Sequence, residues 1–123
     1  MNESAALRAL RRGVHLAAEI PGYDANRPAF VGVYPLDLAL ERSQEFVRNQ
    51  GVEICPRSVI AYRVRRFSID RTLIDSEHGP CESDLHDKAG VIAFTENELV
   101  SALGDFGISL SALELPAHTD YPI

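Results

Sequence analysis

The sequence predicts one domain of the α+β class (or α/β), with a small central sheet of about three to four strands packed with about three helices. Three observations support this prediction. The chain has 123 residues, the usual size of one domain, so a single globular domain is expected over 1–123. Hydrophobic residues make up 46% of the chain and charged residues 24%, as in globular proteins. Segments with helical spacing of apolar residues alternate with short β-branched segments.

An amphipathic helix is predicted near the N-terminus. Its apolar side chains recur with helical spacing at Leu7, Leu10, Val14, Ala17 and Ala18. Ser4 is placed to cap this helix, because a serine hydroxyl accepts a hydrogen bond from the first turn. The Pro21-Gly22 pair is expected to end it, since proline cannot continue the hydrogen-bond ladder.

A strand and a second helix are predicted next. Residues 29–34 are rich in β-branched and aromatic side chains and lie between two prolines, a pattern typical of a strand. Residues 36–49 carry an apolar stripe with helical spacing, and Gly51 is well placed to end that helix.

Residues 57–70 fit either strand or helix. Ile60, Tyr62 and Val64 alternate with polar residues, but the phase slips before Phe67. A β-bulge, or a hairpin at Arg65-Arg66, would absorb the slip. A helix also fits, although the density of β-branched residues favours a strand.

The second half is expected to begin with a polar loop at 76–88, with one helical turn at 83–88 as an alternative. Residues 90–94 then predict a buried strand, followed by a helix that ends at Gly107. Thr95 and Glu98 form a capping box at the start of that helix. The tail holds three leucines, so part of it is expected to pack.

The charges divide unevenly along the chain. Residues 1–72 contain 11 arginines and 8 acids, a net charge of +3, whereas residues 73–123 contain one lysine and 10 acids, a net charge of −9. This asymmetry indicates a charged partner, although an acidic surface that keeps the protein soluble explains it as well. Direct binding of nucleic acid is not expected, because phosphates require a dense basic face.

Catalytic and metal signatures are weak. His78, Cys81 and His86 lie within nine residues, but their spacing matches no standard zinc pattern, and a histidine–carboxylate pair in this loop has no distinguishing context. No metal, no cofactor and no enzymatic activity are therefore expected. The other cysteine, Cys55, is expected to be buried, with both thiols unpaired. Tyr62, Arg63, Arg65, Arg66 and Phe67 form a basic and aromatic patch that we interpret as the polar face of a strand.

The N-terminus carries an acid at Glu3 and does not resemble a signal peptide. No apolar segment approaches the ~18 residues that indicate a membrane span. A cytoplasmic location without membrane contact is therefore expected.

Three segments resemble small bacterial immunity proteins of contact-dependent growth inhibition and related polymorphic toxin systems. They are residues 53–58, 88–100 and 115–123, which carry structural rather than catalytic motifs. The resemblance implies a cytoplasmic protein that binds a cognate toxin domain and blocks it, often by covering the basic cleft of a nuclease that acts on tRNA or DNA.

The acidic half of the chain agrees with such a basic partner. We expect the partner-binding residues to be the acids of the turn-rich loop and one later acid: Asp75, Glu77, Glu82, Asp84, Asp87 and Asp105. Two alternatives remain open. One is a small metal-dependent or acid–base enzyme that uses the loop of His78, Cys81 and His86, and the other is a structural subunit of a larger complex.

Overall fold

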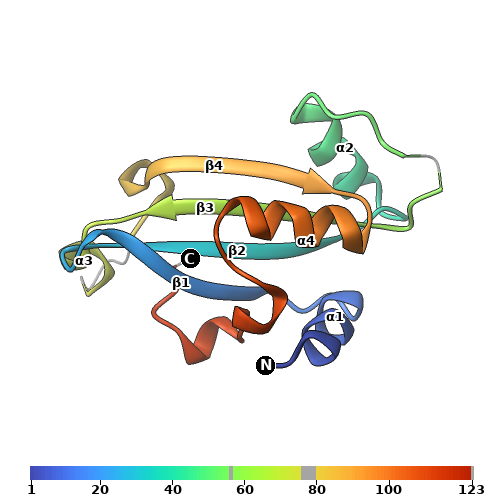
Figure 1. Cartoon of the computed structure of the whole chain (residues 1–123). Helices are drawn as coiled ribbons and strands as arrows, with labels where there is room; N and C mark the ends of the chain where they lie inside the picture. The colour runs from blue at the N-terminus through green and yellow to red at the C-terminus, as the bar shows by residue number, and fades with distance from the viewer. Residues whose placement is uncertain (56, 76–79, 123) are drawn as a thin grey trace.

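The computed structural model describes residues 1–55, 57–75 and 80–122 and has an α+β fold (Figure 1). Four strands form one antiparallel sheet in the order β1-β2-β3-β4. The elements are α1 Glu3–Arg11, β1 Leu16–Asp24, β2 Arg27–Asp37, α2 Glu41–Asn49, β3 Ile60–Ser68, α3 Arg71–Ile74, β4 His86–Ala93 and α4 Glu96–Asp105. Three 3-10 turns are added at Glu82–Asp84, Leu110–Ala112 and Pro116–His118.

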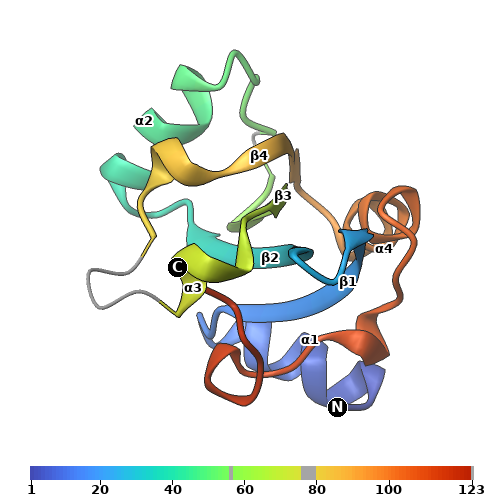
Figure 2. The same cartoon turned by 90° about the vertical axis from the view of Figure 1, so that its left-hand side faces the viewer.

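The two faces of the sheet are covered differently. Helices α1 and α4 pack on one face, where Leu10, Leu99 and Leu103 join the main hydrophobic core. The opposite face is covered at one end by α2, through Val47, and elsewhere by the C-terminal tail, through Tyr121 (Figure 2). The sheet therefore has one face packed against two helices and one face with a more polar, partly open surface.

The C-terminal tail passes around the β1 edge of the sheet. Leu113 packs in the core under α1 and α4, and Tyr121 packs with Phe30 and Phe67 on the opposite face. Between them, the backbone of Glu114 exchanges hydrogen bonds of 2.8 and 2.9 Å with that of Ala17 in β1. This tail closes one edge of the sheet and delivers Tyr121 to the polar face.

The predicted N-terminal helix is too long. Helix α1 ends before Gly13, whose φ of +87° stops the helix, and residues 16–24 form β1 instead. The reason is tertiary: Leu16, Ala18 and Ile20 face the main core while Ala17 faces the other cluster, so apolar residues on both faces imitate a helical stripe. Asn2, and not Ser4, caps the helix by accepting the backbone N–H of Ala5 at 2.8 Å.

The undecided segment 57–70 contains strand β3, and the hairpin at Arg65-Arg66 is wrong. The strand is continuous because both of its faces are buried, Val64 on the main core and Phe67 on the other cluster. The alternation of apolar residues slips in the sequence because side chains of β3 are buried on both faces of the sheet. Pairing with β4 becomes irregular only between Arg66 and Ser68.

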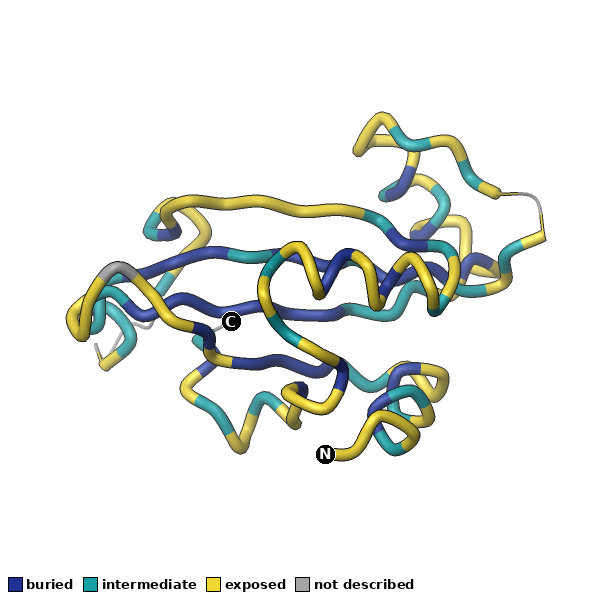
Figure 3. The backbone as a smooth tube through the Cα atoms, in the orientation of Figure 1, coloured by how far each residue is buried: buried dark blue, intermediate teal, exposed yellow. Residues whose placement is uncertain are grey.

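Strand β4 begins earlier than predicted, at His86, and it is not a buried strand. Residues 86–91 are exposed, and only Ala93 is buried (Figure 3). Strand β4 lies at the edge of the sheet and pairs with β3 alone. The 3-10 turn at Glu82–Asp84 precedes it, in place of the helical turn considered for 83–88.

The other local predictions are largely confirmed. The strand over 29–34 lies within β2, which continues through Leu36 and so delays the start of α2 to Glu41. Gly51 and Gly107 adopt φ of +74° and +83° just after α2 and α4. The backbone N–H of Glu98 donates to the hydroxyl of Thr95 at 3.1 Å, as the capping box requires.

Candidate functional site

The predicted partner-binding acids lie on several elements. Asp75 follows α3, Glu82 and Asp84 belong to the 3-10 turn, Asp87 lies in β4 and Asp105 ends α4. Glu77 lies outside the described residues. The structure thus places Glu82, Asp84 and Asp87 close together along the chain, whereas Asp105 comes from a separate helix.

Glu82 is not a free surface acid. Its Oε1 accepts a hydrogen bond from Nη2 of Arg65 at 2.7 Å and lies 4.0 Å from Nζ of Lys88. The hydrogen bond from Arg65 is the main cause that lowers the pKa of Glu82, and the positive charges of Arg65 and Lys88 lower it further. Its charge is therefore compensated within the protein, which makes it the weakest member of the predicted set for an electrostatic contact with a partner.

The other described acids of the predicted set are not held by a cation. Asp84 accepts the backbone N–H of Cys81 at 2.9 Å, and this hydrogen bond lowers its pKa. Asp87, which adopts a φ of +53°, accepts from the hydroxyl of Ser68 at 2.9 Å. Within residues 1–55, 57–75 and 80–122, none of Asp75, Asp84, Asp87 and Asp105 forms an ion pair. Four of the six predicted acids thus remain uncompensated.

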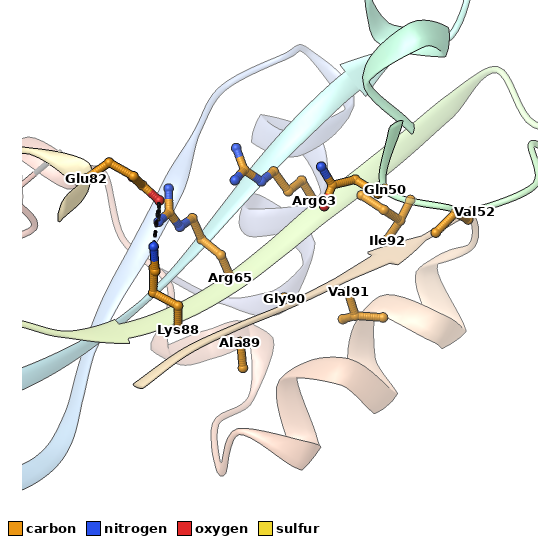
Figure 4. A pocket seen from close by; sticks show the side chains of 10 residues that line it. All are labelled: Gln50, Val52, Arg63, Arg65, Glu82, Lys88, Ala89, Gly90, Val91 and Ile92. Carbon is orange, nitrogen blue, oxygen red and sulfur yellow. Dashed lines mark hydrogen bonds and ion pairs between the residues drawn. The ribbon is translucent and has the colours of Figure 1, made fainter. Parts of the chain in front are cut away.

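Beside Glu82, the polar face of the sheet forms a groove of about 240 Å³ (Figure 4). Strands β3 and β4 supply its base and the segment after α2 supplies one wall. Three cationic side chains and one acid line it, together with a glutamine amide: Arg63, Arg65, Lys88, Glu82 and Gln50. The groove therefore carries a net positive charge in a protein whose overall net charge is −6.

Alternation along β3 builds the cationic side of this groove. Arg63, Arg65 and Phe67 point to one face, and Tyr62 and Arg66 point to the other. The basic and aromatic patch expected from the sequence is thus divided between the two faces. Arg65 is nearly buried, with 8% of its surface exposed, and its guanidinium lies 5.2 Å from the ring centre of Phe67.

Arg63 is held by aromatic residues that are distant in sequence. Its guanidinium carbon lies 4.8 Å from the ring centre of Phe46 in α2 and 5.6 Å from that of Tyr34 in β2. Sequence reasoning did not associate these residues, because neither aromatic is near Arg63 in the chain. The one available signal was the Arg-x-Arg alternation between apolar residues of β3.

A polar aromatic cluster adjoins Arg63. The hydroxyls of Tyr34 and Tyr121 share a hydrogen bond, and burial together with this bond raises the pKa of Tyr121. The ring of His15 stacks on Tyr34 with 4.0 Å between centroids. Its Nε2 is buried and has no hydrogen-bond partner among the described residues, and burial lowers the pKa of His15.

The loop proposed as an alternative metal site is only partly described, since His78 lies outside the described residues. Among the described part of the chain, no group of three or more His, Cys, Asp or Glu side chains is arranged to hold a metal ion. Cys81 is exposed and contacts Ser83 and Asp84. Cys55 is also exposed, so the expected burial of Cys55 is wrong, because the segment after α2 lies on the surface.

Comparisons with known proteins give no relative: no family model, no curated protein and no solved structure matches this chain. Among the described helices, none combines the length and apolar composition needed to cross a membrane.

Proposed function

We propose that this chain is an immunity-type inhibitor, which binds a cognate toxin domain and neutralises it without catalysing a reaction. The proposed target is a basic domain, a nuclease that acts on tRNA or DNA, and the inhibitor covers its active-site cleft in the cytoplasm. The resemblance of residues 53–58, 88–100 and 115–123 to such immunity proteins suggests this class of partner.

One observation carries the proposal: Asp75, Asp84, Asp87 and Asp105 form no ion pair with any described cation. An exposed charge that is already paired inside the protein contributes little to attracting a partner, whereas an unpaired one acts at a distance of about a Debye length. These four acids therefore favour encounter with a positively charged surface. Glu82 is assigned a structural role, because Arg65 and Lys88 already hold it.

The proposed mode of action is steric and electrostatic. A nuclease cleft that binds phosphates must present cations, and a rigid acidic surface competes for the same cations. The fold suits this role because residues 86–105 place Asp87 and Asp105 on a strand and a helix, whose backbones are held by the sheet and the core. Rigid presentation reduces the entropy lost on binding.

A toxicity assay tests this function. A cognate toxin domain is first sought in the reading frame next to the gene for this chain. It is then expressed in a bacterial host with this chain or with its Asp75→Asn, Asp84→Asn, Asp87→Asn and Asp105→Asn variant. We expect growth with the unchanged chain and reduced growth with the variant, since asparagine keeps the shape but removes the charge. A chain that gives no protection would contradict the proposal. A matched variant changes Glu3, Glu41, Glu45 and Glu53 to Gln. These exposed acids also form no described ion pair but lie in the net positive first half of the chain, so this variant should still protect.

A further inference from the structure

Arg63 presents hydrogen-bond donors that none of the described residues uses. Its guanidinium lies against the rings of Phe46 and Tyr34, at 4.8 and 5.6 Å from their centres. It makes no hydrogen bond or ion pair with any described residue, in contrast to the neighbouring Arg65. Aromatic contacts occupy the faces of a guanidinium and leave its edge free, and that edge matches the two oxygens of a carboxylate.

One carboxylate of the protein itself already lies in this groove. The carboxylate of Glu82 lies between Arg65 and Lys88 and occupies one part of the groove (Figure 4). The part beside Arg63 and the amide of Gln50 holds no carboxylate from the described residues. With three cations and one acid, the groove can accept a second negative charge without becoming net negative.

We propose that Arg63 receives the carboxylate of an Asp or Glu side chain from a protein partner. The groove, at about 240 Å³, is smaller than the roughly 300–1,000 Å³ of small-molecule sites, so it suits a single side chain. A phosphate chain is disfavoured, because its several negative charges exceed the net charge of three cations and one acid in the groove, whereas a single carboxylate does not. Arginine framed by aromatic side chains is also the composition of interface hot spots.

This inference rests on the proposed function only because it requires a protein partner. It adds to that function a second contact, in which the charges have the opposite sign. The acids Asp75, Asp84, Asp87 and Asp105 would attract a basic surface, while Arg63 would bind an acid within or beside that surface. Such a pair of contacts of opposite sign fixes the orientation of the partner, because a reversed orientation would bring like charges together.

A peptide selection tests the inference without the toxin. A phage-displayed random peptide library is selected on the full chain, and the enriched peptides are measured against Arg63→Gln, Arg63→Lys and Arg42→Gln. Arg42 lies exposed on α2 and provides the matched control, since its substitution changes the net charge equally. Thermal unfolding of each variant confirms that it folds.

We expect enriched peptides to share an Asp or Glu, and their affinity to fall at least about tenfold in Arg63→Gln with no change in Arg42→Gln. Arg63→Lys keeps the charge but loses the two-pronged edge, so it should weaken binding as well. The inference is overturned if no peptide is enriched, if the enriched peptides share no acid, or if they bind Arg63→Gln as tightly as the unchanged chain. Because the toxin is absent, its failure would leave the proposed function standing.

Discussion

Tyr121 fills the space that a β-carbon on Gly32 would need. The phenol hydroxyl lies directly over this glycine of β2, and the ring packs between Phe30 and Phe67 at centroid distances of 5.9 and 5.4 Å. Tyr121 can thus pack on the polar face of the sheet because Gly32 has no side chain there.

We predict that Gly32→Ala lowers the free energy of unfolding by about 1–3 kcal/mol, because the new methyl group collides with Tyr121 in a packed cluster. Gly90→Ala is the matched control: Gly90 lies on the same face in β4, and a β-carbon there would meet only the carbonyl of Val64 at 3.5 Å. Neither glycine adopts a positive φ. Denaturant unfolding measures both, and equal stabilities would refute the proposed close packing of Tyr121.

The elements that could be predicted are those encoded by local chemistry. The capping box of Thr95 and Glu98 and the stop at Gly107 involve neighbours in sequence, so α4 was predicted with its correct limits. Strand β1 could not be predicted, because only pairing with β2 distinguishes its apolar residues from a helical stripe. The site was missed for a similar reason, since Phe46, Tyr34 and Arg63 meet only in the folded sheet.

Charge pairing was equally hidden in the sequence. The acid-rich loop gave no sign that Glu82 reaches back to Arg65, because the two residues come from different elements. Pairing of this kind decides which acids remain available to a partner. The sequence could therefore indicate an acidic half but not the members of it that stay uncompensated.

A pH dependence follows from His15. Burial lowers the pKa of His15 below its ordinary value of 6.5, so the unfolded chain binds a proton more readily than the folded one. The contribution of His15 to the free energy of unfolding should therefore be fully present above about pH 7. It should decline as the pH falls through 6.5 toward the lower pKa of the folded state.

We predict that His15→Phe reduces the fall in melting temperature between pH 7 and pH 5.5, because phenylalanine keeps the stack on Tyr34 without a group to protonate. Glu82 and Asp84 have lowered pKa values, so they lose their contributions to stability only at a more acidic pH. They therefore do not affect the comparison between pH 7 and pH 5.5. Thermal melts across the window decide the matter. If the melting temperature falls equally in the variant and the unchanged chain, protonation of His15 does not cause the pH dependence.

The thiol of Cys55 is predicted to react readily with alkylating agents. A hydrogen bond from the hydroxyl of Ser58 lowers the pKa of the Cys55 thiol, and this residue is exposed. Ser58→Ala should shift the pH of half-maximal alkylation of Cys55 upward and slow the reaction at neutral pH. Mass spectrometry of the two thiols gives both rates in one sample, with Cys81 as the internal reference. An unchanged profile for Cys55 would show that Ser58 does not stabilise its thiolate.

Association kinetics with the proposed cognate toxin domain test the central claim most directly. Stopped-flow rates are measured at several salt concentrations for the unchanged chain, the variant with Asp75, Asp84, Asp87 and Asp105 changed to Asn, and the control variant with Glu3, Glu41, Glu45 and Glu53 changed to Gln. Both variants remove four negative charges. We predict that the first lowers the association rate at low salt by about tenfold or more and flattens its salt dependence, while the control changes little. Equal rates for the two variants would contradict the claim that these four uncompensated acids guide the partner.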